Sequence, residues 1–203
     1  AGGALTVTPV LNNAGTVVVA SGSTMTVSSG EMQTSGITQV DGTFTVNAAP
    51  ITLSGGELAG TGTINGNNPN VVNSGGTVKP GDSPGTLAIS GNYSQGSGGN
   101  LLVEFDKSSA GLLAVKGTAI LGGTLDISYL GPANSDGTYL INAGDPGSTF
   151  NFLTYGTLSN SDIGSLFSNE YSVGGSYFVN GIADDNVGAN PAAYPLTQHV
   201  ISK

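Results

Sequence analysis

Two stretches decide the fold: GTVVVASGSTMTVSSG (15–30) and GTFTVNAAPITLSGG (42–56). Both consist of short segments in which apolar and polar residues alternate, and glycines separate these segments. Threonine and the β-branched residues favour strands, and glycine adopts the positive φ angle that a sharp corner requires. The two stretches therefore predict short β-strands joined by tight bends.

The spacing of the bends favours a solenoid over a sandwich. The glycines at 15, 22, 30, 36 and 42 lie six to eight residues apart, whereas sandwich strands with their turns recur every 8–12 residues or so. Such short strands suit the sides of a coil whose corners stack. We therefore expect an all-β parallel β-solenoid (β-helix), with roughly 20 residues in each coil. The two stretches look like successive units of an imperfect repeat, and their starts lie 27 residues apart.

Three regions differ in composition. Residues 1–100 are the most solenoid-like. Residues 101–182 read as a C-terminal solenoid or β cap with longer strands, because five of the seven Tyr and five of the six Phe lie in 101–180. Within this region, 138–143 reads as a strand and 161–171 as one or two helical turns. Residues 183–203, with two prolines, read as an extended tail.

The charge balance excludes several classes of protein. The chain has four Lys, no Arg and thirteen acidic residues, which gives a net charge of −9. Nucleic-acid binding is not expected, because contacts to phosphates need basic groups. The absence of cysteine excludes disulfides and cysteine zinc sites. We expect no membrane insertion, since no stretch approaches the roughly 18 apolar residues of a membrane helix.

The segment GGTVKPGDSPGTLAISGNYSQGSGGNLLVEF (75–105) resembles the C-terminal part of the passenger β-helices of bacterial autotransporters and of related large secreted repeat proteins. The match rests on the turn at 80–85 followed by Thr86-Leu87 and by Gly91-Asn92-Tyr93, and it extends over about residues 55–130. The resemblance implies a right-handed β-helix in an exported bacterial protein, secreted or at the cell surface, with an adhesive or biofilm-related role.

Two departures from that family affect the expectation. The chain has no room for the membrane barrel in which autotransporters end, and its last residues, Ile201-Ser202-Lys203, form no sorting signal. We therefore expect a processed or excised fragment, or a freely released protein built from the same module.

Few residues are candidates for chemistry. Asp184, Asp185 and Asn186 offer oxygen ligands suited to Ca²⁺, but they lack EF-hand spacing, and a solvated acidic loop is the alternative interpretation. Glu104 and Asp106 lie two apart on one strand, so with Lys107 they are placed to bind a cation or a sugar. The alternative is an ordinary polar strand face. Ca²⁺ is the one cofactor considered.

A serine nucleophile is not expected. Ser83 is followed directly by proline and lacks the Gly-x-Ser-x-Gly elbow. The single histidine, His199, lies more than a hundred residues further along the chain. Asp and Ser are common residues at Pro-Gly turns. We therefore assign no catalytic residues and do not expect an enzyme.

The ends of a solenoid suggest self-association. Open ends expose unpaired backbone groups that add further strands unless they are capped. The tail carries an apolar segment with Leu196, Val200 and Ile201, which is placed to add a strand to a neighbouring copy. Folding back onto its own chain is the alternative.

The expected function is structural or adhesive: a surface stalk, a biofilm matrix protein or a self-assembling fibre subunit. The first alternative is a module that binds surface glycans through exposed Asn, Thr and Tyr. The second is a polysaccharide-degrading β-helix enzyme.

Overall fold

The protein is a parallel β-solenoid, as the sequence predicts. A computed structural model describes residues 2–82, 84–106, 109–130, 149–159, 169–173 and 193–197. The strands form three sheets, and each turn of the chain adds one strand to each sheet in the order A, B, C. The strands β1 to β18 thus make six coils, three strands to a coil. The described residues contain no helix, and none that could span a membrane.

Sheet A consists of β1 (Ala4–Val7), β4 (Thr24–Val27), β7 (Thr43–Val46), β10 (Thr63–Asn65), β13 (Thr86–Ile89), β16 (Leu112–Val115), β19 (Thr149–Thr154) and β22 (Ala193–Thr197). Sheet B consists of β2 (Leu11–Asn13), β5 (Glu31–Gln33), β8 (Ile51–Leu53), β11 (Val71–Asn73), β14 (Tyr93–Gln95), β17 (Thr118–Ile120) and β20 (Thr157–Leu158). Sheet C consists of β3 (Thr16–Val19), β6 (Ile37–Val40), β9 (Glu57–Gly60), β12 (Thr77–Pro80), β15 (Asn100–Phe105), β18 (Thr124–Tyr129) and β21 (Asn169–Val173).

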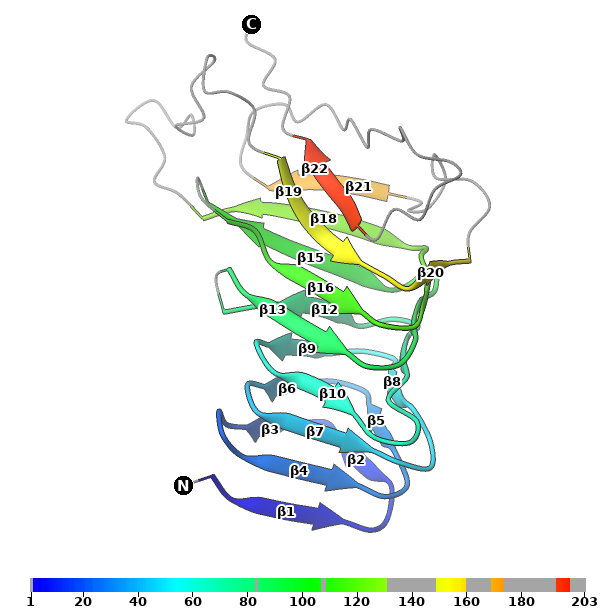
Figure 1. Ribbon diagram of the computed structural model, residues 1–203. Helices are drawn as coiled ribbons and strands as arrows, with labels where there is room; N and C mark the ends of the chain where they lie inside the picture. Colours follow the sequence, from blue (N-terminus) through cyan, green and yellow to red (C-terminus); the bar gives the residue numbers. More distant parts are fainter. Residues whose placement is uncertain are drawn as a thin grey trace, which may run out of the picture.

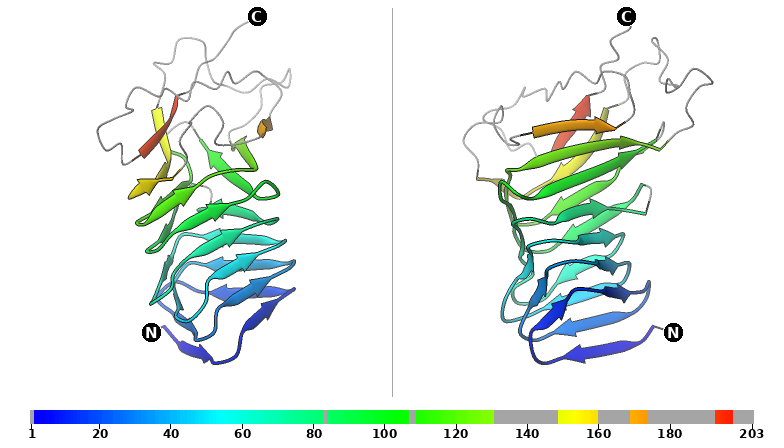
Figure 2. Two further views of the ribbon diagram at one scale, coloured as in Figure 1. Left: turned by 90° about the vertical axis from the view of Figure 1, so that its right-hand side faces the viewer. Right: turned by 180° about the vertical axis from the view of Figure 1, so that it is seen from behind.

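The coils wind in the right-handed sense. In Figure 1 the strands of sheet A run from left to right in front, those of sheet C return from right to left behind, and the chain rises from the N-terminus. This is the hand that parallel crossovers almost always adopt, because strand twist favours it. Figure 2 shows the coils stacked as a column with the N-terminus at one end.

The repeat that the register defines is about 20 residues long. In sheet A, Thr24 pairs with Ala4, and Thr43 pairs with Thr24. The 27-residue unit expected from the sequence is therefore wrong. Thr16 begins a strand of sheet C, whereas Thr43 begins a strand of sheet A. Gly-Thr precedes strands of both sheets, so this dipeptide recurs within a coil and obscures the true period.

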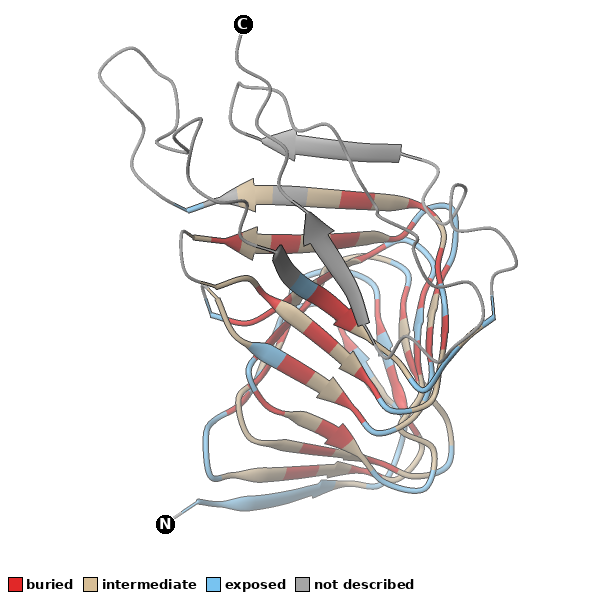
Figure 3. Ribbon diagram, turned by 45° about the horizontal axis from the view of Figure 1, so that its top comes forward, coloured by how far each residue is buried: buried red, intermediate tan, exposed pale blue. Residues whose placement is uncertain are grey.

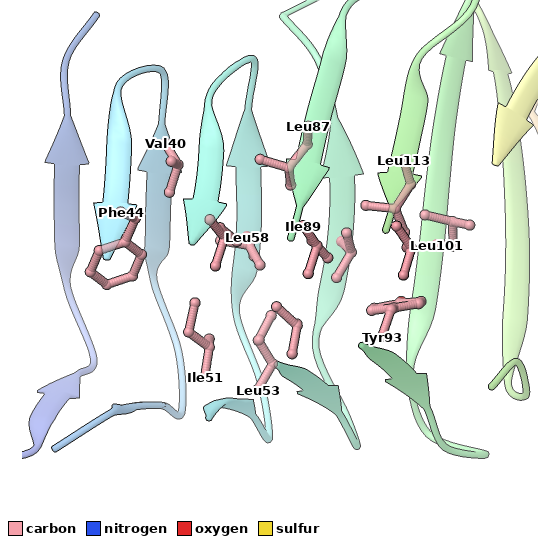
Figure 4. Packing of buried hydrophobic residues seen from close by; sticks show 14 of the residues in the cluster. Val40, Phe44, Ile51, Leu53, Leu58, Leu87, Ile89, Tyr93, Leu101 and Leu113 are labelled. Carbon is pink, nitrogen blue, oxygen red and sulfur yellow. The ribbon is translucent and has the colours of Figure 1, made fainter. Parts of the chain in front are cut away.

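The core is a single column of apolar side chains between the three sheets. Residues alternate along each strand between the interior and the outer face, and Figure 3 shows buried and less buried positions alternating along the ribbon. The largest fully buried side chains include Phe44, Leu58 and Tyr93, which Figure 4 shows pointing into the space between the sheets. Each such residue contributes about 1.5–3 kcal/mol by leaving water.

The C-terminal part continues the same ladders. In sheet C, β15 pairs in register with β12, and β18 pairs with β15 along its whole length. The expected helical turns at 161–171 meet a strand in their last part, because Asn169–Val173 form β21, which pairs with β18. The rest of that segment and the expected strand at 138–143 lie outside the described residues.

Glycine at the corners permits the close stacking of coils. Gly36 lies directly above Gly15, as the bond from the Ile37 N–H to the Gly15 carbonyl shows (2.8 Å). Gly36 has a φ of 68°, and a Cβ there would lie 1.9 Å from the Gly15 carbonyl oxygen. A Cβ on Gly15 would have no atom within 4 Å. The two glycines thus occupy equivalent corners, with very different tolerance for a side chain.

We expect Gly36→Ala to lower the free energy of unfolding by about 1–3 kcal/mol or more, because it adds both left-handed strain and a backbone clash. Gly15→Ala is the matched control and is expected to change stability by no more than about 0.5 kcal/mol. Urea denaturation followed by circular dichroism measures both values. Equal stability of the two variants would contradict the stacking of these corners.

Candidate functional site

Most of the predicted site residues in the tail lie outside the described part of the chain. This applies to the Ca²⁺ candidates Asp184, Asp185 and Asn186 and to Val200 and Ile201. The residues considered for a serine nucleophile, Ser83 and His199, also lie outside it. Their roles stay predictions.

Leu196 is described as part of β22. This strand pairs antiparallel with β19 of the same chain, and Leu196 lies opposite Phe150. In residues 193–197 the tail therefore folds back onto its own chain, which was the alternative to a strand added to a neighbour. Tail-mediated association stays a prediction.

Glu104 and Asp106 form separate local interactions. Glu104 lies on β15 and forms an ion pair with Lys79 of the preceding coil, with 3.2 Å between Nζ and Oε1. Asp106 follows the end of β15 and accepts a hydrogen bond from the backbone N–H of Ser109 (2.8 Å). That bond closes a tight turn, which is a structural role for this carboxylate. Lys107 lies outside the described residues.

The Pro-Gly turn at residues 80–85 is anchored to an earlier coil. The Asp82 carboxylate accepts a hydrogen bond from the Gln39 amide (3.0 Å), and the same amide nitrogen donates to Asp41 (3.0 Å). Asp41 also accepts from the Thr61 backbone N–H (3.1 Å). These bonds hold successive C-to-A corners together. Among the described residues, no group of three or more His, Asp or Glu side chains is placed to hold a metal ion.

The structure reveals a buried column of amide side chains that the sequence analysis missed. Asn13, Gln33, Asn73 and Gln95 occupy equivalent inward positions at the ends of the sheet B strands, and all are buried. Each side-chain amide donates to the backbone carbonyl of the first residue of the sheet C strand in the next coil. The acceptors are the carbonyls of Ile37, Glu57, Asn100 and Thr124.

These amides also satisfy backbone groups within their own corner. The side-chain oxygen of Asn13 accepts from the Gly15 N–H (2.9 Å), and that of Asn73 accepts from the Gly76 N–H (2.9 Å). A buried N–H without a partner costs about 1–3 kcal/mol. The column therefore joins each coil to the next at the corner between sheets B and C, where strand pairing is interrupted.

A buried carboxyl group lies beside this column. Glu31 begins β5 between Leu11 and Ile51 of the neighbouring strands, and it is 2% exposed. The Asn13 amide donates to the Thr38 hydroxyl (2.9 Å), and this hydroxyl donates to Glu31 Oε1 (2.6 Å). The Oε2 atom has no hydrogen-bond partner.

Burial determines the protonation of this group. Desolvation raises the pKa of Glu31 from 4.5 to about 7, and the hydrogen bonds with the Thr38 and Asn13 side chains oppose this only in part. A buried carboxyl group is neutral below its raised pKa because the low-dielectric interior disfavours its charged form. The group lies inside the core, so it contacts no solute, and its arrangement serves structure rather than catalysis.

Comparison with protein-family models, with curated proteins and with solved structures found no match for this chain. The fold is compatible with the β-helix modules that residues 75–105 resemble.

Glu31 makes the stability of the protein depend on pH. Below pH 4.5 the carboxyl is protonated in both the folded and the unfolded chain, so stability is highest. Between pH 4.5 and about 7 the unfolded chain loses the proton first, and stability falls by about 3 kcal/mol in total. We expect Glu31→Gln to be more stable than wild type at pH 8 by up to this amount, and to differ little at pH 4.

Urea denaturation at pH 4, 6 and 8 measures this dependence. Glu57→Gln, which removes a half-buried carboxylate from the outer face of sheet C, is the control for the loss of one negative charge. A constant difference between Glu31→Gln and wild type across this pH range would contradict a buried titrating carboxyl.

Proposed function

We propose that the chain is a structural β-solenoid, part of an extracellular stalk, matrix or fibre, and that it associates end to end through its first coil. The observation that carries this proposal is the unpaired edge at the N-terminal end. The strands β1, β2 and β3 are the outermost strands of their sheets. Each therefore presents one row of backbone N–H and C=O groups without a neighbouring strand.

The interior of this first coil is also open at the same end. Leu5 occupies an inward position, because it pairs with the buried Met25, yet it is 58% exposed. Val7, Leu11 and Val17 are only partly buried against the core. An apolar end of this kind gains free energy by contact with another apolar end.

The sequence of the first coil carries none of the usual protection against strand addition. Natural sheets block exposed edges with charged residues, especially lysine, whereas residues 1–30 contain no charged residue. A second copy of this chain supplies an end with the same unpaired groups and the same apolar interior. The resemblance of residues 75–105 to secreted repeat proteins supports an extracellular setting.

We expect the purified chain to associate as its concentration rises, because pairing buries both the edges and the apolar end. Leu5→Lys places a charge in the interface and is expected to weaken association at least tenfold. Met32→Lys is the matched control, since Met32 is similarly exposed (49%) on the outer face of sheet B. Sedimentation and negative-stain electron microscopy measure the association. Monodisperse wild-type protein at high concentration, or unchanged association of Leu5→Lys, would contradict the proposal.

A further inference from the structure

The outer face of sheet A carries a regular array of threonines. In the first four coils the strands β1, β4, β7 and β10 pair in register. The outward positions form two columns, and six of the eight residues are threonine. The first column is Ala4, Thr24, Thr43 and Thr63, and the second is Thr6, Thr26, Thr45 and Asn65.

The packing beneath the array fixes its geometry. Met25, Phe44 and Ile64 lie between the threonines on their strands and are buried in the core, so the threonines face outward. A shift of register by one residue would expose these apolar side chains, which holds the strands in place. The Thr45 hydroxyl donates to the Asn65 side-chain oxygen (2.9 Å), which shows that neighbours in a column lie within hydrogen-bond reach.

The array is specific to sheet A. On the outer face of sheet C the same coils carry Val18, Ile37, Gln39, Glu57 and Lys79, a mixture of apolar, polar and charged side chains. The outward positions of sheet A carry no charge in these coils. Because both faces belong to one fold with one composition, strand propensity alone does not account for the threonines.

The array has two fixed spacings. Threonines in neighbouring coils lie about 4.8 Å apart, and those two apart on one strand lie about 6.6 Å apart. Threonine is stiff at χ1, so its methyl and hydroxyl groups repeat with the backbone. A rigid array with two repeats is complementary to a ligand whose own surface repeats in two directions.

We propose that the outer face of sheet A binds ice. Oxygen atoms on the prism face of ice repeat at distances close to both spacings of the array. Threonine methyl groups restrict the water around them, and the hydroxyls hydrogen-bond to that water. The absence of charged groups on the face is favourable, because a charged side chain such as lysine holds a strong hydration shell of its own. This inference goes beyond the proposed structural role and uses a different surface.

Crystalline polysaccharide is another ligand with a repeating surface. Its flat sugar rings stack best on aromatic side chains, and none stands at these eight positions. The face therefore suits ordered water better than sugar.

The test is incorporation of the purified chain into a slowly growing ice crystal, measured as the fraction of protein in the ice against that in the liquid. We expect severalfold enrichment of wild type over bovine albumin. The double variant Thr43→Lys/Thr45→Lys is expected to lose it. The matched control is Thr52→Lys/Thr77→Lys, which adds the same charge at half-buried outward positions of sheets B and C and is expected to keep it. Circular dichroism and thermal melts confirm that all variants fold.

The outcomes are distinct. Leu5→Lys is expected to retain ice incorporation even where association is lost, so this test and the assembly test can fail independently. Wild-type protein that enters ice no more than albumin would overturn the inference. The same holds if Thr43→Lys/Thr45→Lys enters ice as well as its control, if the face binds powdered cellulose or chitin without enrichment in ice, or if the double variant alters only the oligomeric state.

Discussion

The structure depends on the parallel, in-register pairing of each coil with the coils before and after it. A strand of three or four residues is too short to be stable alone, so its backbone groups are satisfied only by the neighbouring coils. This pairing sets the period of about 20 residues in the first four coils, where Thr43 pairs with Thr24 and Thr63 with Thr43. The alternation along each strand then separates a continuous core from three outer faces.

The corners are the places where this pairing is interrupted, and two devices compensate. Glycine allows one backbone to approach another, as Gly36 approaches Gly15. The buried amides of Asn13, Gln33, Asn73 and Gln95 cross from one coil to the next and accept or donate where strand pairing stops. The interior is therefore polar along one edge of sheet B and apolar elsewhere. Glu31 is the most costly member of this polar group, because its charged form has no compensation in the core.

The sequence predicted the fold class because alternation and glycine spacing are local signals. The approximate coil length was also predicted, but the assignment of segments to coils was wrong, because Gly-Thr precedes strands of sheets A and C alike. Three of the buried amides stand at positions 13, 33 and 73, so a 20-residue comparison of the sequence with itself would have found them.

The role of Glu31 could not be predicted in the same way. Its burial depends on which face of β5 points inward, and this follows only from pairing with Leu11 and Ile51. The interactions of Glu104 with Lys79 and of Asp82 with Gln39 join residues in different coils. They depend on the register, which the sequence left open.

The register between coils is the central claim, and cysteine pairs test it directly because the chain has no cysteine of its own. Thr26 and Thr45 are paired neighbours on the outer face of sheet A, about 4.8 Å apart. Thr26→Cys/Thr45→Cys should therefore be cross-linked within one chain by dibromobimane, giving a fluorescent monomer. Val18→Cys/Thr45→Cys, separated by 27 residues, should not react in this way, because Val18 lies on sheet C and Thr45 on sheet A. Cross-linking of the second pair and not the first would contradict the account.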